Sequence, residues 1–234
     1  MAKRKGANER AEDKRLHRLR VTVVGAAAVV AILVVGVGIY LSSKPTALVL
    51  DEGRTYREVP GMLVPADSPI LVTEFFSYGC AACATLEPRL EDWVAALPDD
   101  VEFDRVPFVG NPLWNVFARG YFAMRDIGLL GAHHSNLFDA IHARGRNIST
   151  DERFADFVAA GNREAFLRSF NGVRVDRAMR RADELGRALG IVAVPTLVVD
   201  NRYVVIGQGA SIDALRVAEM LIDKARDERA SVSS

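Results

Sequence analysis

Cysteine is nearly absent from this chain of 234 residues, which has only Cys80 and Cys83, in the sequence Cys-Ala-Ala-Cys. With no third cysteine, any thiol exchange must run within this pair or between it and another molecule. Tetrahedral zinc needs four ligands, and only His133, His134 and His142 remain as candidates to complete the pair. We expect the first two in a polar connection between helices and the third in a helix, where solvated or capping roles are typical. No metal and no other cofactor is therefore expected.

An excess of basic residues is also missing, since 30 Lys and Arg balance 30 Asp and Glu. The balance hides an asymmetry, because residues 1–20 hold eight basic residues against three acidic ones. The remainder has 22 basic and 27 acidic residues and is therefore net acidic. Nucleic acid is thus excluded as an expected partner of the main part of the chain.

One long apolar run stands out, because the 21 residues from Val21 to Leu41 contain no charge. That length suffices to cross the hydrocarbon core of a bilayer as a helix. The basic tail 1–20 before it predicts a cytoplasmic N-terminus and export of the rest. A cleaved signal peptide is the alternative, but its apolar core would have about 7 to 15 residues and a small-residue cleavage site. We favour an uncleaved signal anchor at 21–41 in contact with inner-membrane lipid.

The exported part, about 190 residues, is long enough for one domain with a substantial core. Proline and glycine interrupt residues 42–68, which predicts a tether with a possible short strand. We expect strands at Ile70–Phe76 and Val101–Phe108. Between them, apolar residues recur at helical spacing up to Leu97, with a kink expected at Pro88.

Helical periodicity dominates the middle of the chain, from about Asn111 to Gly190. Ser149 with Glu152 forms a capping box for one helix there, and Gly161 is expected to close it. Asn162 is the expected cap of the next helix.

Strands return near the C-terminus, at Thr196–Val199 and Tyr203–Ile206. They are predicted to form a hairpin through Asp200-Asn201, whose residues tolerate the left-handed backbone conformation. Ser211 is expected to start a final amphipathic helix.

The Cys-Ala-Ala-Cys motif follows a strand and opens a helix. Backbone N–H groups and the positive end of the helix dipole then face Cys80, which should make it more acidic than a free thiol. This arrangement favours a redox-active dithiol over a zinc site or a purely structural disulfide.

Two charged residues occupy apolar positions of the predicted strands. Glu74 is in phase with Ile70 and Val72, and Arg105 is in phase with Phe103. An unpaired buried charge is costly, so we infer that Glu74 and Arg105 approach each other in the sheet. Exposed positions at a strand end or sheet edge are the alternative.

The order of elements resembles an α/β thioredoxin-like fold with an inserted all-helical domain, as in the DsbA family of exported thiol:disulfide oxidoreductases. The resemblance covers about residues 70–225. It rests on Glu-Phe-Phe-Ser-Tyr-Gly-Cys-Ala-Ala-Cys at 74–83, the place of the insertion, and Val-Pro-Thr at 194–196. The implied division has thioredoxin-like parts at 69–110 and 191–228, the insertion at 111–190, and a flexible tail at 229–234.

This resemblance implies a membrane-anchored enzyme that introduces disulfide bonds into exported proteins through Cys80 and Cys83. It implies that Pro195 is cis and lies against the cysteines, and that the backbone of Val194 pairs with substrate. Glu74 and Arg105 would help to move a proton beneath the buried sulfur. The implied partners are unfolded exported polypeptides with thiols and a quinone-linked membrane protein of the DsbB type, with the catalytic domain in the periplasm.

One residue departs from the family pattern. Many oxidising members carry a histidine just before the second cysteine, where this chain has Ala82. A reductase or isomerase on the same fold therefore remains an alternative. A third possibility is an anchored, non-catalytic chaperone with a structural Cys-x-x-Cys.

Overall fold

The protein is seen in a computed structural model that describes residues 50–59, 68–158, 161–206 and 213–232. The predicted tail 1–20 and anchor 21–41 lie outside these residues. Within the described ranges, no helix is both long and apolar enough to cross a membrane.

Five strands form one mixed sheet in the order β1-β5-β4-β2-β3. The strands are β1 (Tyr56–Glu58), β2 (Ile70–Phe76), β3 (Val101–Pro107), β4 (Thr196–Val199) and β5 (Tyr203–Val205). β2 runs parallel to β3 and antiparallel to β4, and the other pairs are antiparallel. The strand that leads into the cysteines is therefore central, whereas β3 is an edge strand. The possible short strand predicted within 42–68 is present as β1.

The hairpin between β4 and β5 forms as predicted. Asp200 and Asn201 have φ angles of 58° and 51°, in the left-handed region. Asp200 is also buried and forms an ion pair with Arg229 of the last helix. The turn is thus stabilised in two ways: both residues tolerate the left-handed conformation, and Asp200 is paired with Arg229.

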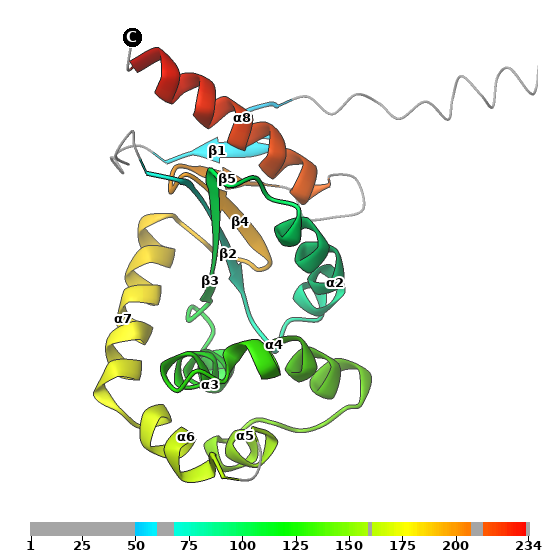
Figure 1. Ribbon diagram of the computed structural model, residues 1–234, viewed down its shortest axis with the longest axis vertical. Coiled ribbons are helices and arrows are strands. Elements are labelled where there is room, and N and C mark those ends of the chain that lie inside the picture. Colours follow the sequence, from blue (N-terminus) through cyan, green and yellow to red (C-terminus); the bar gives the residue numbers. More distant parts are fainter. Residues whose placement is uncertain (1–49, 60–67, 159–160, 207–212, 233–234) are drawn as a thin grey trace, which may run out of the picture. The chain divides into compact units, whose positions relative to one another are not determined.

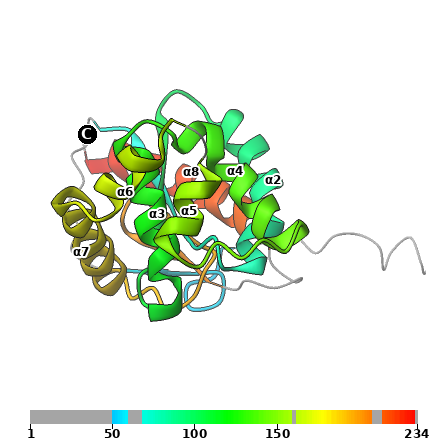
Figure 2. The same cartoon turned by 90° about the horizontal axis from the view of Figure 1, so that it is seen from below.

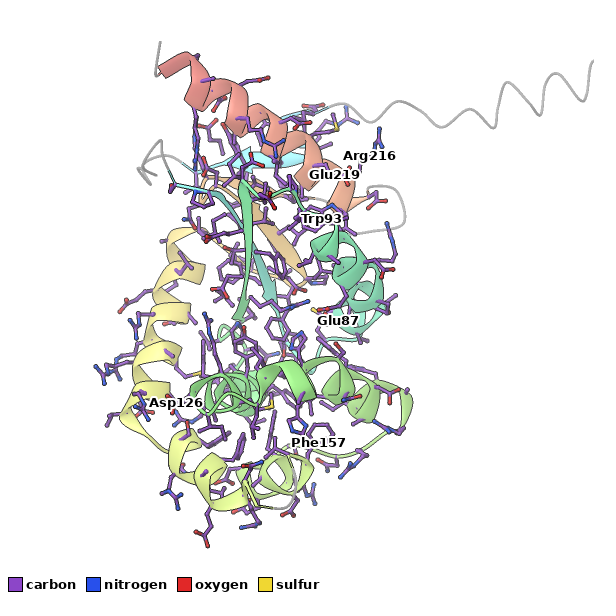
Figure 3. All side chains as sticks on the ribbon, in the orientation of Figure 1. Glu87, Trp93, Asp126, Phe157, Arg216 and Glu219 are labelled. Carbon is purple, nitrogen blue, oxygen red and sulfur yellow. The ribbon has the colours of Figure 1, made fainter. Side chains whose placement is uncertain are left out.

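Helices cover both faces of the sheet (Figure 1). α2 (Ala81–Ala95) and α8 (Ala214–Val232) pack on one face, where Trp93 Nε1 donates to Glu219 Oε1 at 3.0 Å and joins them (Figure 3). The C-terminal end of α7 (Val173–Ala188) packs on the other face, against Phe75 and Val198. The predicted helix after the cysteines therefore exists, and it continues through Pro88. Ser211, the expected start of the last helix, lies outside the described residues. This helix runs to Val232, so residues 229–232 are not the flexible tail that was predicted there.

All helices between β3 and β4 fall within residues 112–188, in agreement with the predicted helical stretch. Apart from the C-terminal end of α7, which reaches back to the face of the sheet, they gather beyond the end of the sheet to which β2 points (Figures 1 and 2). Their aromatic core continues that of β2, because Phe76 packs edge-on to Tyr78 and Tyr121. Besides α7, the elements are a 3-10 turn Pro112–Trp114, α3 (Asn115–Asp126), α4 (Leu130–Phe138), a π-helical turn Asp139–Ala143, α5 (Asp151–Phe157) and α6 (Arg163–Phe170).

The predicted caps in this block need correction. Thr150, not Ser149, caps α5, because its hydroxyl accepts a hydrogen bond from Arg153 N at 3.2 Å. The Ser149 hydroxyl instead donates to Asn147 Oδ1 at 2.6 Å and so is turned away from the helix. α5 ends at Phe157, before the predicted Gly161. Asn162 is the N-cap residue of α6, as predicted, but its side chain makes no capping hydrogen bond.

Candidate active site

Cys80 is the N-cap residue of α2, with φ −96° and ψ 114°. Its sulfur accepts a hydrogen bond from the backbone N–H of Cys83 at 3.3 Å. Cys80 is 7% exposed and Cys83 1%, so Cys80 is the more accessible residue of the pair. The pair is present as two free thiols. A sulfur at this position receives the free N–H groups of the first helical turn, as the sequence predicted.

The two thiols have opposite pKa shifts. A hydrogen bond from the Cys83 thiol, with backbone N–H groups of Cys83 and Ala82 and the charge of His142, lowers the pKa of Cys80 to about 6 despite its burial. The hydrogen bond to Cys80 and burial raise the pKa of Cys83 far above its ordinary value. At neutral pH the reduced pair therefore holds a thiolate at Cys80 and a thiol at Cys83.

The Val194-Pro195 bond is cis, as predicted from the resemblance. It lies beside the cysteines, because the Cys80 sulfur is 3.4 Å from the carbonyl oxygen of Val194. The loop is held at its far side by Thr196, whose hydroxyl donates to the Ala193 carbonyl at 2.8 Å. The backbone of Val194 thus faces the more exposed sulfur of the pair.

Glu74 and Arg105 meet in the sheet, which confirms the inference from the strand pattern. They are directly paired in the parallel register of β2 and β3, and Arg105 Nε donates to Glu74 Oε2 at 3.0 Å. The Glu74 side chain is 1% exposed and the Arg105 side chain 15%. The alternative of two exposed charges is therefore wrong.

Two further carboxylates, Glu87 and Glu91 of α2, were not predicted. Arg105 Nη2 lies 2.6 Å from Glu91 Oε1 and 3.4 Å from Glu87 Oε2. Glu87 is buried on the same helical face as Cys83 and Leu90. A charge in that apolar phase is the signal that identified Glu74, and it would have identified Glu87 as well.

The guanidinium of Arg105 therefore contacts three carboxyl groups, those of Glu74, Glu87 and Glu91. Burial and this shared cation together determine which of the buried two is protonated. Burial raises the pKa of Glu74 to about 8, and Arg105 offsets this only in part. Burial also acts to raise the pKa of Glu87, but His134 and Arg105 outweigh it and the pKa is lowered. At neutral pH the site therefore holds a neutral Glu74 and an ionised Glu87.

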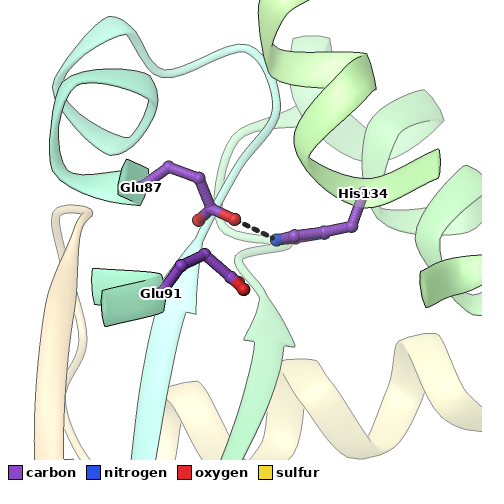
Figure 4. Close-up of side chains that lie close together, drawn as sticks. All are labelled: Glu87, Glu91 and His134. Atoms are coloured by element: carbon purple, nitrogen blue, oxygen red, sulfur yellow. Dashed lines mark ion pairs between the residues drawn. The ribbon is translucent and has the colours of Figure 1, made fainter. Parts of the chain in front are cut away.

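The predicted place of His133 and His134 in a polar connection is wrong, because both lie within α4. His134 is buried, with Nδ1 2.6 Å from the Tyr78 hydroxyl and Nε2 3.2 Å from Glu87 Oε1 (Figure 4). His134 Nε2 is close enough to Glu87 Oε1 for an ion pair, but the angles of this contact do not meet those of a hydrogen bond. His142 lies in the π-helical turn, with Nε2 2.8 Å from the carbonyl of Tyr78.

Comparison with known proteins places this geometry in one family. A family described as a DSBA-like thioredoxin domain matches residues 114–218. The chain is 36% identical over 180 residues to the thiol:disulfide interchange protein DsbA of Azotobacter vinelandii, covering 74% of this chain and 84% of that protein. The DsbA of Pseudomonas aeruginosa is 34% identical over 180 residues, with coverage of 74% and 85%.

Solved structures agree with the sequence relatives. The crystal structure of the oxidoreductase DsbA from Xylella fastidiosa superposes with a TM-score of 0.71 at 32% identity, covering 77% of this chain and all of that chain. A variant of Pseudomonas aeruginosa DsbA gives a TM-score of 0.71 at 33% identity, with coverage of 76% and 100%. This chain, with its Cys-x-x-Cys at the head of α2, its cis-proline loop and its helical block, belongs to the DsbA family of thiol:disulfide oxidoreductases.

Proposed function

We propose that this oxidoreductase donates the Cys80–Cys83 disulfide to thiols of exported proteins. The observation that carries the proposal is the place of the Cys80 sulfur at the N-terminus of α2, where it accepts the Cys83 N–H at 3.3 Å, in keeping with a lowered pKa of Cys80 and a raised pKa of Cys83. A stabilised thiolate at Cys80 favours the reduced form of the pair, so the oxidised form is readily reduced by substrate.

The reaction begins with a substrate thiolate that attacks the Cys80 sulfur of the oxidised pair. A substrate–Cys80 bond forms, the Cys80–Cys83 bond breaks, and the electron pair leaves on Cys83. A second substrate thiolate then attacks the substrate sulfur and releases Cys80 as a thiolate. The substrate loses two electrons as its disulfide forms, and the enzyme pair gains them.

The leaving Cys83 needs a proton, because its raised pKa makes it a poor thiolate at neutral pH. Glu74 is a buried carboxyl that keeps its proton at neutral pH, and the negative charge that it gains on ionisation would act on both cysteines. We assign the supply and recovery of this proton to Glu74, with Arg105 and Glu87 setting its protonation. The Val194 backbone, beside the Cys80 sulfur, is the assigned contact for an extended substrate segment.

The proposed location is the inner membrane, with residues 21–41 as a single span. The uncharged run, the basic tail 1–20 and the absence of a compact cleavage site support it. The catalytic domain would then lie in the periplasm, where substrates are unfolded exported polypeptides with thiols. Reoxidation would come from a quinone-linked membrane partner of the DsbB type.

Ala82 keeps a reductase or isomerase as the second candidate, because no side chain next to Cys83 donates to the thiolate. His142 of the helical block favours the oxidase, since its charge lowers the pKa of Cys80 from outside the motif.

The deciding experiment equilibrates the full-length chain, in detergent, with thiol redox buffers of graded potential. DsbA itself is the reference for a strong oxidant, at about −120 mV, and thioredoxin for a reductant, at about −270 mV. A value near the first supports the oxidase, and a value near the second supports the reductase. If Cys80→Ser retains the full effect on substrate folding, the chain acts as a chaperone and not by exchange.

A further inference from the structure

A second cluster of ligand-type side chains lies beside the cysteines but does not include them. One oxygen each of Glu87 and Glu91 and one ring nitrogen of His134 all lie within 4.8 Å of one another. Figure 4 shows the two carboxylates leaving α2 and the imidazole approaching from α4. Glu87 and Glu91 are four residues apart on the helix, so they share one face.

His134 Nε2 is the most informative atom of the cluster. The residue is 6% exposed, and this nitrogen has no hydrogen-bond partner among the described residues. It lies 3.2 Å from Glu87 Oε1. Bonds of about 2.0–2.1 Å from one metal to a nitrogen and an oxygen, at the tetrahedral angle, put the two ligand atoms at about this separation.

The other ring nitrogen has the partner that a ligating histidine needs. Nδ1 lies 2.6 Å from the hydroxyl oxygen of Tyr78. Without a metal, Nε2 faces Glu87 as an ion-pair partner; with a metal bound, Nδ1 would carry the ring proton and donate it to that oxygen, and Nε2 would turn its lone pair to the metal. Such an outer hydrogen bond fixes the tautomer and orientation of metal-bound histidines.

A cavity gives solvent access to the cluster, and its two carboxylates face a single guanidinium, that of Arg105. A cavity of about 370 Å³ between α2, α4 and the π-helical turn is lined by Glu87, Glu91 and Ser135. The Glu91 side chain is 48% exposed, so it can rotate to complete a ligand set with a water molecule. Arg105 Nη2 contacts both helix carboxylates, so a bound cation would replace this guanidinium nitrogen there, while Arg105 Nε keeps its hydrogen bond to Glu74.

We propose that Glu87, Glu91 and His134 form a binding site for one divalent transition-metal ion of the zinc class. Imidazole and carboxylate ligands suit zinc, and the site leaves a fourth position for water. The sequence motifs predict no metal, because a zinc site built on the two cysteines lacks further ligands at a suitable spacing. This site uses neither sulfur.

The test is calorimetric titration of the full-length chain with zinc chloride, in detergent, with Cys80 and Cys83 oxidised so that no thiolate can bind. We expect one zinc ion per chain. Glu91→Gln and His134→Gln should each weaken the affinity at least about tenfold, since even loss of an outer-shell partner costs that much. His133→Gln, in the same helix but outside the cluster, is the matched control and should bind as the parent does.

Absence of binding to the oxidised parent chain would overturn the proposal, and so would equal affinity in Glu91→Gln. Glu91 is half-exposed, so this variant gives a result even if the buried His134→Gln fails to fold. Cobalt supplies a second readout on the same protein. A visible cobalt spectrum that is lost in His134→Gln and kept in His133→Gln supports the nitrogen–oxygen site, and a spectrum that is unchanged in Glu91→Gln and His134→Gln overturns it.

Discussion

Glu74 and Arg105 are hydrogen-bonded across parallel strands at 3.0 Å, yet the carboxyl keeps its proton at neutral pH. The main reason is burial, and the nearby charge of Glu87, which shares Arg105 with Glu74, adds to it. Glu74 is the most deeply buried of the three carboxyl groups that contact Arg105, so desolvation raises its pKa to about 8. A neutral acid next to a fixed cation is suited to exchange a proton with a buried sulfur.

The stability of the oxidised protein should therefore fall as pH rises from 5 to 9. A carboxyl with a raised pKa stabilises the fold below its unfolded pKa of 4.5, and this contribution is lost as pH rises through about 8. The loss should be on the order of 3–5 kcal/mol and absent in Glu74→Gln, which cannot titrate. Urea unfolding at both pH values measures it. The control is Glu102→Gln at an exposed position, which should keep the parent's pH dependence. If the unfolding free energy of Glu74→Gln changes with pH as much as that of the parent, the raised pKa does not belong to Glu74.

Arg105→Met should destabilise the protein by about 3–5 kcal/mol at pH 7. The change leaves the buried Glu87 carboxylate and its neighbour Glu91 without their cation. Arg125→Met is the matched control, because Arg125 forms a surface ion pair with Asp104 at 3.3 Å and should cost less than about 1 kcal/mol. Equal unfolding midpoints in urea for the two variants would argue against a structural role of the buried cluster.

Cys83→Ser should trap a covalent intermediate. Its Cys80 thiolate attacks a disulfide-bonded peptide, one peptide sulfur joins Cys80, and the other leaves as a thiol. The second sulfur that would release the peptide is missing, so the adduct accumulates and is seen by mass spectrometry without reductant. Cys80→Ser should form no adduct, because the buried Cys83 is 1% exposed. An adduct on Cys83 would reverse the assigned roles.

The reduced protein should show one thiolate that titrates near pH 6. Alkylation of Cys80 by iodoacetamide should speed up as pH rises through that value, because the thiolate is the nucleophile. His142→Gln removes a charge that lowers the pKa of Cys80, so its curve should shift to higher pH. His133→Gln serves as the control, and a shift of the same size there would rule out a specific effect of His142.

Two glycines test the packing of the helical block. A Cβ atom on Gly120 of α3 would lie 2.3 Å from the ring of the buried Phe154, so Gly120→Ala should cost about 1–3 kcal/mol. Gly131 of α4 faces open space, and Gly131→Ala should stabilise by roughly 0.5–1 kcal/mol through helix propensity. Thermal unfolding of both variants gives the comparison. A stabilised Gly120→Ala would mean that Phe154 can move aside.

Local patterns predicted the parts of the site that depend on neighbouring residues. Period-two alternation in two strands was enough to pair Glu74 with Arg105, since parallel neighbours share a register. The left-handed tolerance of Asp200 and Asn201 located the hairpin. The motif at the head of α2 placed Cys80 among free backbone N–H groups. The cis bond before Pro195 came from the family resemblance.

Contacts between distant helices could not be predicted in the same way. His134 meets Glu87 only because α4 docks against α2, and neither residue's own helix reveals which neighbour its face will meet. Periodicity alone could have marked Glu87 as buried, but not its partner. The helix cap at Thr150 was missed because Ser149 turned to Asn147, a competition that residue preferences do not decide.

The contact between Cys80 and Val194 also has a consequence in time. The two residues are 114 positions apart, with the whole helical block between them. A ribosome that builds the chain from its N-terminus therefore releases the thiol pair well before the loop that shields it. During that interval the two thiols of the nascent protein lack their contact with the Val194 loop. They can then be oxidised by another thiol:disulfide oxidoreductase, in the same reaction that the folded protein carries out on its substrates.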